Sequence, residues 1–531
     1  MRNLYVVAIG GSGERVMRSL IMLLASGVNV QAERVVPVFI ENDIESNALT
    51  SCTNLLKYYS NAQADNNCRG LGVHATYEKI GAEVKNWPSF CKTIIEEPIT
   101  LNQAGDAIGN LAAVIGHYDK TQPVYDRIDE ERELLFTPDD LAMKLTVGFV
   151  GNPNIGSVVL NSLALSGETF EDLKTRFSSN DGVIVVGSLF GGTGAAGLPL
   201  VVNSINEMED AKRPMLGTIA ILPYFVTNPQ ANIAVNIIDT TKYNVQSNAF
   251  DAKTRAALMY YAQYMKDMNC MYYVGDSKAK DVYPHCIGGE RQANRAHLVE
   301  VMSALAVVDF AKQRPGTECT YKRPVWGIND GGDTRRLPTN VAGIKNRELA
   351  RALVKFRMMV QIFKDPEFLK FSIEQKHPYA HNIGFTEPMR SNVVLENQAE
   401  NGITSWGLNK LIREWEKWMN ELGRDDANRK FKIYDDVQAA TDANLTSKFY
   451  TDTPFGLAKT EMRGIFKKVE TAVDADVQEA LAAAYNELHP KGNADSALTY
   501  SDDERLPRLL QIISVALDEV LDKRCNDLVK A

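Results

Sequence analysis

The stretch GVIVVGSLFGGTGAAGLPLVV, residues 182–202, decides the fold class that this sequence predicts. Its first five residues form an apolar, mostly β-branched run without polar alternation, which is typical of a strand buried on both faces of a parallel sheet. Residues 187–197 are mainly glycine and alanine, and an apolar run begins at Leu198. A buried strand, a glycine-rich turn and a following helix predict a phosphate-binding loop, because glycine lets a phosphate reach the backbone N–H groups at the helix N-terminus.

Small residues also permit close packing of a helix on a sheet, and this is the competing interpretation of residues 187–197. One close packing contact does not require so many small residues within a single turn. We therefore favour the phosphate-binding loop.

A second glycine-rich turn follows the apolar run at residues 4–9. It consists of Gly10, Gly11, Ser12, Gly13 and Glu14, and apolar positions with helical spacing begin after it at Val16. This turn again places backbone N–H groups at the start of a helix. The dinucleotide-binding fingerprint needs a third Gly or Ala where this chain has Val16, so the turn alone does not identify a ligand.

Short apolar runs alternate with helical stretches through the first half of the chain. Strands are expected at residues 4–9, 35–40, 146–150, 182–186, 217–222 and 270–274. This alternation predicts an α/β fold with a mostly parallel, Rossmann-like sheet flanked by helices. Because ligands of such sheets bind beyond the carboxyl ends of the strands, the loops after these runs form the candidate site.

The remaining segments follow other patterns. Residues 50–145 lack the strand and loop pattern, and we interpret them as an insertion. From residue 340 the sequence becomes mainly helical, with helices expected at 347–363, 405–422, 457–488 and 506–529. The last helix carries an apolar stripe that consists of Leu509, Ile512, Ile513, Ala516, Leu517, Val520 and Leu521. We interpret this stripe as an intramolecular packing face, with a partner-binding helix as the alternative.

Length, charge and cysteine content restrict the function classes. At 531 residues and 58.9 kDa the chain exceeds one typical domain. A net charge of −9 argues against general binding of nucleic acid or anionic membranes, which requires clustered Lys and Arg. The apolar run at residues 4–9 is too short for a signal peptide or a membrane span. Seven scattered cysteines without a C-x-x-C pair favour free thiols in a cytoplasmic protein over a zinc site or a disulfide framework.

The glycine-rich segment resembles a known family. Gly191, Gly192, Thr193 and Gly194 are similar to the heart of the signature loop of the tubulin and FtsZ superfamily, and Phe190 and Ala195 flank them in the same loop. Residues 40–49, which include Asn42 and Asp43, resemble the FtsZ loop after the second strand, near the phosphates and magnesium.

Three further segments resemble family loops in the family's order. Residues 151–156 resemble the loop that contacts the terminal phosphate, with Gly151, Asn152, Pro153, Asn154 and Gly156 as the matching positions. Residues 221–225, with Pro223 and Tyr224, resemble the strand and loop near the ribose. Residues 293–305 resemble the start of the central helix, where the family reads guanine with an Asn, here Asn294.

The resemblance implies a divergent bacterial tubulin-like protein that uses GTP or GDP and Mg²⁺, with Asp43 holding the metal through water. It implies a nucleotide-binding domain over residues 1–315 with a central helix at about 293–312. A second domain would begin within residues 316–400, and a helical region would occupy 401–531. Three departures stand out: Phe190 replaces the first signature glycine, alanines interrupt the end of the signature, and Glu14 replaces the usual FtsZ Asn.

The resemblance also places a hydrolytic loop after the central helix. Residues 327–333 resemble the family's Asn-x-Asp loop, although the acid comes one residue early, and Asn329, Asp330 and Asp333 are the candidate catalytic residues. A carboxylate there would orient water for attack on nucleotide held by the neighbouring subunit of a head-to-tail filament. The alternative is an ordinary Asn-Asp-Gly-Gly turn.

Several site residues keep a second interpretation. Asn152 and Asn154 are also typical turn formers beside Pro153, Asn294 is also a typical helix cap, and His297 is more typical of a packed helix residue than of a catalyst.

Three functions compete. The favoured hypothesis is a GTPase whose nucleotide state controls self-assembly or binding of a protein partner through the helical C-terminal region. The second is a scaffold that binds nucleotide without hydrolysing it. The third is an NAD-binding oxidoreductase, with Gly11 and Gly13 at the pyrophosphate and Glu41 or Asp43 at a ribose. The second glycine-rich loop counts against the third, since a dinucleotide site needs only one.

Overall fold

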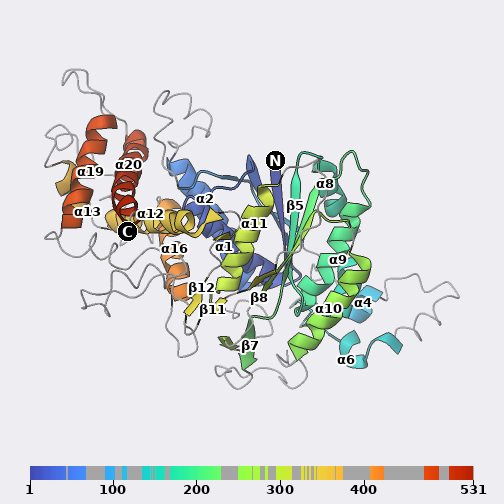
Figure 1. Ribbon diagram of the computed structural model, residues 1–531. Helices are drawn as coiled ribbons and strands as arrows, with labels where there is room; N and C mark the ends of the chain where they lie inside the picture. The colour runs from blue at the N-terminus through green and yellow to red at the C-terminus, as the bar shows by residue number, and fades with distance from the viewer. Residues whose placement is uncertain are drawn as a thin grey trace, which may run out of the picture.

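The computed structural model describes residues 1–43, 46–66, 90–101, 110–115, 134–143, 145, 148–149, 151–161, 168–228, 249–265, 267–275, 281–284, 295–313, 325–327, 329–331, 334–336, 340–341, 344–364, 366–374, 407–423, 472–488 and 502–529. Within these ranges a central sheet is covered on both faces by helices, and further helices lie to one side of it (Figure 1).

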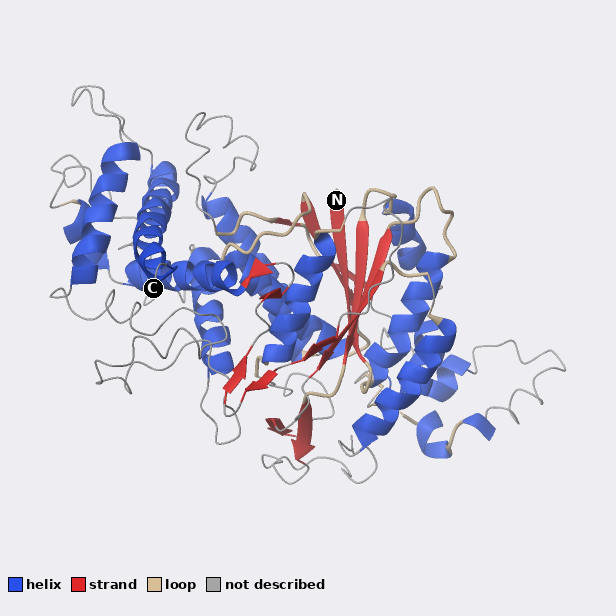
Figure 2. Cartoon of the chain, in the orientation of Figure 1, coloured by secondary structure: helices blue, strands red, loops and turns tan. Residues whose placement is uncertain are grey.

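The central sheet has eight described strands, and every pairing between them is parallel. They are β1 (Asn3–Ile9), β2 (Arg34–Ile40), β3 (Ile94–Ile95), β4 (Ile99–Leu101), β5 (Gly182–Ser188), β6 (Met215–Ile221), β8 (Cys270–Gly275) and β10 (Val325–Gly327). Their order is β10-β8-β6-β5-β1-β2-β3, and β4 also pairs with β2. The predicted α/β fold with a mostly parallel sheet is confirmed (Figure 2).

Two features of the sheet were not anticipated. The segment at residues 50–145, expected as an insertion, contributes β3 and β4, which extend the sheet beside β2. Of the strand expected at 146–150 the structure describes only Gly148 and Phe149, and neither is in a strand. Gly148 has φ +76°, a left-handed conformation that ends an extended run. The strand prediction was therefore wrong for these two residues.

Alternate side chains of the strands enter two different cores, as the two-residue period of a strand requires. One core joins Leu4, Val6 and Ala8 of β1 to α1 (Gly10–Ala25), α2 (Asn47–Asn66) and α11 (Leu298–Ala311). The other joins Tyr5, Val7 and Ile9 to α7 (Pro153–Val159), α8 (Glu168–Arg176) and α9 (Gly192–Asn206). Helix α10 (Phe250–Tyr264) packs beside α9 (Figure 1).

Helix α11 corresponds to the expected central helix, although it begins later than residue 293. It is apolar on nearly all sides and buried along almost its whole length. His297 caps its N-terminus: its Nδ1 accepts from the backbone N–H of Val299, and Glu300 accepts from the backbone N–H of His297. These contacts fix where the helix starts.

The other described elements are short. They are α4 (Leu111–Ile115), α6 (Pro138–Leu141) and three strand pairs: β7 (Phe225–Asn228) with β9 (Asp281–Pro284), β11 (Asn329–Gly331) with β12 (Thr334–Arg336), and β13 (Asn340–Val341) with β14 (Ile344–Lys345). Among the described helices, none is both long and apolar enough to cross a membrane.

The described C-terminal part is helical, as predicted. It consists of α12 (Asn346–Lys364), α13 (Pro366–Ile373), α16 (Gly407–Gly423), α19 (Ala472–Leu488) and α20 (Asp502–Val529). The apolar stripe of α20 is buried within the chain, so this stripe is an intramolecular packing face. Lys355 of α12 reaches α20, where its Nζ lies 2.6 Å from Asp518 Oδ2.

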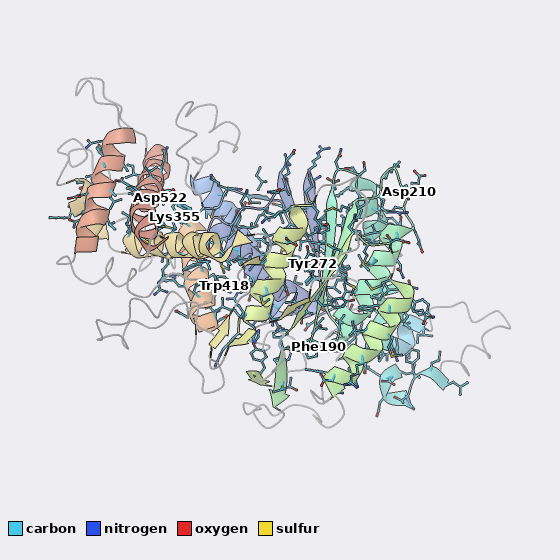
Figure 3. All side chains as sticks on the ribbon, in the orientation of Figure 1. Phe190, Asp210, Tyr272, Lys355, Trp418 and Asp522 are labelled. Carbon is cyan, nitrogen blue, oxygen red and sulfur yellow. The ribbon has the colours of Figure 1, made fainter. Side chains whose placement is uncertain are left out.

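Helix α16 packs mainly on α2 and reaches α1 (Figure 3 labels Trp418 on it), and its Trp415 ring also contacts Phe356 of α12, with centroids 5.0 Å apart. The indole N–H groups of Trp415 and Trp418 donate to Ser26 and Ser19 at 2.8 and 3.3 Å. Near its end, Glu421 Oε2 accepts from Arg18 of α1 and from the backbone N–H of Ala296, both at 3.0 Å. One glutamate of α16 thus holds α1 to the start of the central helix.

Candidate functional site

The two glycine-rich turns meet at the carboxyl ends of neighbouring strands. Strand β1 pairs with β5, and α1 and α9 begin directly after them. Gly10 has φ +68°, and a Cβ built on it would lie 3.1 Å from Thr193 Cβ. The structure therefore brings Gly10, Gly11, Ser12, Gly13 and Glu14 beside Gly191, Gly192, Thr193, Gly194 and Ala195.

Close packing explains some of these glycines without any ligand. A Cβ on Gly13 would lie 2.8 Å from the carbonyl oxygen of Val186, and a Cβ on Gly194 would lie 2.6 Å from the backbone nitrogen of Ser188. Gly11 differs, because a Cβ there would meet only Glu14 Oε2, at 4.0 Å. Packing thus requires glycine at positions 13 and 194, and it does not require glycine at position 11.

The loop at residues 151–156 lies against the start of α9. A Cβ on Gly192 would lie 2.8 Å from Phe149 Cβ and 3.1 Å from the backbone nitrogen of Gly151. Asn152 is the extended N-cap residue of α7 and forms no side-chain cap, with Pro153 at the first helical position. Its side chain is half-buried, whereas that of Asn154 is exposed.

Gly156, at the other end of this loop, packs closely on α9. A Cβ on it would lie 3.0 Å from Ala196 Cβ, so α7 and α9 touch through small residues. Three expected loops therefore adjoin one another around the N-terminus of α9.

The loop after β2 points its polar groups inward. Glu41, Asn42 and Asp43 are each buried. One carboxylate oxygen of Glu41 accepts from the backbone N–H groups of Asn42 and Asp43 at 2.7 and 3.1 Å, and the N–H of Gly11 also donates to this carboxylate. The side-chain amide of Asn42 donates to the carbonyl of Leu145. Glu41 therefore ties the loop after β2 to the first glycine-rich turn.

Three carboxyl groups gather at this edge of the sheet. Glu14 is fully buried and accepts from Ser46 Oγ at 3.1 Å, while its other oxygen has no hydrogen-bond partner. Burial, and then the charge of Glu41, raise the pKa of Glu14 well above its ordinary value. Burial raises the pKa of Glu41 to about 7, and the charge of Asp43 adds to that shift. The ionised form of these carboxyl groups is therefore disfavoured, and a cation at this edge would stabilise it.

No group of three or more His, Cys, Asp or Glu side chains in the described part of the chain is arranged to hold a metal ion. A cation at Asp43 would depend on water and on ligand oxygens for the rest of its coordination. Mg²⁺ is commonly bound in this way, through one or two carboxylates together with phosphates.

A buried polar network lies behind the first turn. Arg15 Nη2 donates to Tyr224 at 2.8 Å, Arg15 Nε lies 3.0 Å from Glu300 Oε1, and Tyr224 donates to Glu300 at 2.9 Å. Tyr224 is fully buried, while the neighbouring Pro223 is half-buried. The Tyr224 hydroxyl thus joins α1 to the central helix.

Phe190 is also buried, and its ring contacts the rings of Tyr224, Phe225 and Phe250 with centroids 4.8–6.2 Å apart. It lies at the end of the sheet where the loops gather (Figure 3). Phe190 and Tyr224, which were expected to contact the nucleotide, pack against each other in the protein interior.

The sequence patterns did not predict one basic residue that lies beside these loops. Lys253 of α10 is half-buried, and its Nζ donates to the carbonyl of Gly151 at 2.7 Å. Burial lowers its pKa. The sequence around it is an unremarkable helix with other polar residues, so no motif singled it out.

The remaining candidates lie elsewhere. Asn294 and Asp333 fall outside the described residues. Asn329 and Asp330 belong to β11, which follows β10 at the edge of the sheet and forms a hairpin with β12. Since β8 and β6 separate β10 from β5, β10 lies about 14 Å from β5 across the sheet at ordinary strand spacing, and β1 lies one strand further away.

Comparisons with known proteins add little. No protein-family model and no curated protein matches the chain. Among solved structures, CetZ from Methanosaeta thermophila strain DSM 6194 matches with a TM-score of 0.23 and 13% sequence identity, over 52% of this chain and 46% of that chain. The match thus spans less than half of the CetZ chain. Similarity at this level assigns no family, so the function has to be inferred from the site.

Proposed function

We propose that this protein binds GTP or GDP with Mg²⁺ in the manner of tubulin and FtsZ proteins. The observation that supports it best is the contact between the two glycine-rich turns at the ends of β1 and β5. The N-cap residues of α1 and α9 are Ile9 and Gly191, whose side chains cannot cap the first N–H groups of their helices. Two such N-termini at one place favour a ligand with several anionic oxygens.

Magnesium is part of the proposal because of the carboxyl groups at this edge. In their ionised forms, these carboxyl groups would repel a polyphosphate that arrived alone. A nucleotide carrying Mg²⁺ offsets that repulsion, with Asp43 facing the metal through water. In this arrangement the turn amides hold the phosphates, and the side chain of Asp43 orients the metal.

The choice of guanine rests on the resemblance of residues 293–305 to the base-reading segment of the family. An Asn that hydrogen-bonds the base edge discriminates well against a base with the opposite donor pattern. We expect affinity for GTP to exceed affinity for ATP at least about tenfold. Equal affinities in a competition assay would remove the guanine assignment and leave the phosphate site. Binding of NAD in preference to both would favour the oxidoreductase.

Nucleotide-controlled self-assembly and hydrolysis between subunits complete the proposal. Asn329 and Asp330 follow β10, the edge strand of the described sheet, away from the turns of their own subunit, and Asp333 lies outside the described residues. A head-to-tail neighbour would supply this loop, and a carboxylate on it would orient the attacking water. The scaffold alternative differs in one respect: nucleotide is bound and never hydrolysed. Phosphate release from GTP at high protein concentration separates the two.

Gly11→Val provides the sharpest test of the phosphate site. Position 11 has room for a Cβ, so the variant should fold, yet its branched side chain would crowd the phosphates at the turn. We expect GTP affinity to fall at least about a hundredfold, with unchanged circular dichroism, because the backbone contacts are lost. Wild-type GTP affinity in a folded Gly11→Val protein would show that this turn has only a packing role.

A further inference from the structure

Lys253 occupies a distinctive place beside the proposed phosphate site. It lies in the first turn of α10, and its Nζ is held 2.7 Å from the carbonyl oxygen of Gly151. The backbone nitrogen of the same Gly151 lies 3.1 Å from where a Cβ on Gly192 would be. Gly151 therefore lies between the ammonium group of Lys253 and Gly192, the first residue of α9.

The position of α10 is fixed by a second contact. The hydroxyl of Tyr261 donates to the carbonyl oxygen of Ala195 at 2.7 Å, and both groups are buried. Tyr261 lies two turns beyond Lys253 on the same helix. Because α10 is anchored to the first turn of α9, the base of the Lys253 side chain is held in place while its end can still move.

The charge of Lys253 is not balanced by a carboxylate in the described part of the chain. Other basic residues near the turns have such partners: Arg15 pairs with Glu300, and Arg18 pairs with Glu421. Lys253 is half-buried and has one neutral carbonyl oxygen instead. A partly buried cation with a neutral acceptor gains most from an anion that reaches it, because hydrogen bonds between charged groups are the stronger ones.

We propose that Lys253 contacts the terminal phosphate of a bound nucleoside triphosphate. The inference rests on the proposed function and adds a specific residue to it. On binding, Nζ moves from the Gly151 carbonyl to a phosphate oxygen, where its positive charge attracts the negatively charged phosphate. The terminal phosphate gains this contact, while a diphosphate does not reach it. Lys253 therefore sets the preference for the triphosphate over the diphosphate.

The test compares three variants of the full chain. Lys253→Met keeps the length of the side chain and removes its charge, and Lys253→Arg keeps the charge. Arg255→Met is the matched control, since Arg255 is an exposed basic residue on the same helix. Affinities for GTP and GDP are measured by calorimetry with Mg²⁺ present, and thermal unfolding is measured without nucleotide.

We expect Lys253→Met to weaken GTP binding at least about tenfold and GDP binding less than about threefold, as loss of one charged hydrogen bond implies. Lys253→Arg should restore most of the GTP affinity, and Arg255→Met should match the wild type. Equal losses for GTP and GDP, together with a lower unfolding temperature, would show that Lys253 only clamps the loop and would overturn this inference alone. A wild-type protein that binds neither nucleotide would remove the proposed function and the inference with it.

Discussion

Replacing Glu300 with Gln tests the buried network that joins α1 to the central helix. The side chain of Glu300 is 2% exposed and that of Arg15 is 10% exposed, with 3.0 Å between Nε and Oε1. Gln keeps the shape and can still accept hydrogen bonds, so the change removes mainly the negative charge. Arg15 then stays buried with Tyr224 and no opposing charge. Breaking a buried ion pair from one side costs about 3–5 kcal/mol of unfolding free energy.

An exposed pair supplies the reference. Arg34 and Glu96 lie 2.6 Å apart, yet their side chains are 49% and 38% exposed. Water screens such a pair, and Glu96→Gln should cost at most about 1 kcal/mol. Comparing the unfolding free energies of Glu300→Gln and Glu96→Gln therefore separates the effect of burial from the effect of losing a carboxylate.

Urea unfolding followed by tryptophan fluorescence is a suitable assay, because Trp415 and Trp418 contact Ser26 and Ser19 at α1. Glu300→Gln should shift the fluorescence transition to clearly lower urea than Glu96→Gln does. Combining Glu300→Gln with Arg15→Met should cost less than the sum of the two single changes, since the second removes the charge that the first left unpaired. Additive costs, or equal shifts for the two Gln variants, would refute this account of the network.

Three further predictions concern the loops. Gly192→Ala should lower the unfolding free energy by about 1–3 kcal/mol, because its Cβ would lie 2.8 Å from Phe149 Cβ, and an unchanged unfolding midpoint would contradict the packing geometry. Asp43→Asn should weaken GTP binding in Mg²⁺ and leave binding in EDTA unchanged, and equal effects in calorimetry under both conditions would exclude a metal-linked role. Asp330→Ala and Asp333→Ala should keep GTP binding, and at least one should lose turnover by about two to four orders of magnitude; a GTPase rate per subunit that is constant over a hundredfold dilution, with both variants fully active, would rule out catalysis between subunits.

The long buried strands were predictable because each is a continuous apolar run. β1, β2, β5, β6 and β8 agree with their predicted ranges to within two residues at either end. The two residues of β3 and the three of β4 carry no periodicity that a sequence pattern could detect. Their place beside β2 is set by tertiary pairing.

The contacts of the site were predictable only in part. The sequence placed glycine-rich turns after β1 and β5, and parallel pairing brought them together. The sequence did not reveal that Glu41 accepts hydrogen bonds from neighbouring loop amides. An acidic residue that accepts such bonds and one that does not look the same in a sequence. Lys253 was missed for a similar reason: α10 lies a hundred residues from Gly151 in the chain, and only folding brings them within 2.7 Å.

The docking of α16 determines how this protein can be shortened for laboratory work. Trp415 and Trp418 are almost completely buried, and they donate hydrogen bonds to Ser26, which caps the end of α1, and to Ser19 within α1. A truncated chain of residues 1–315 would lack both rings and leave about 300–500 Å² of their apolar contact surface open to solvent. New apolar exposure of this kind is an aggregation liability in a truncated chain. An expression fragment built around the central sheet should therefore extend through α16, even though residues 312–406 separate this helix from the central helix in sequence.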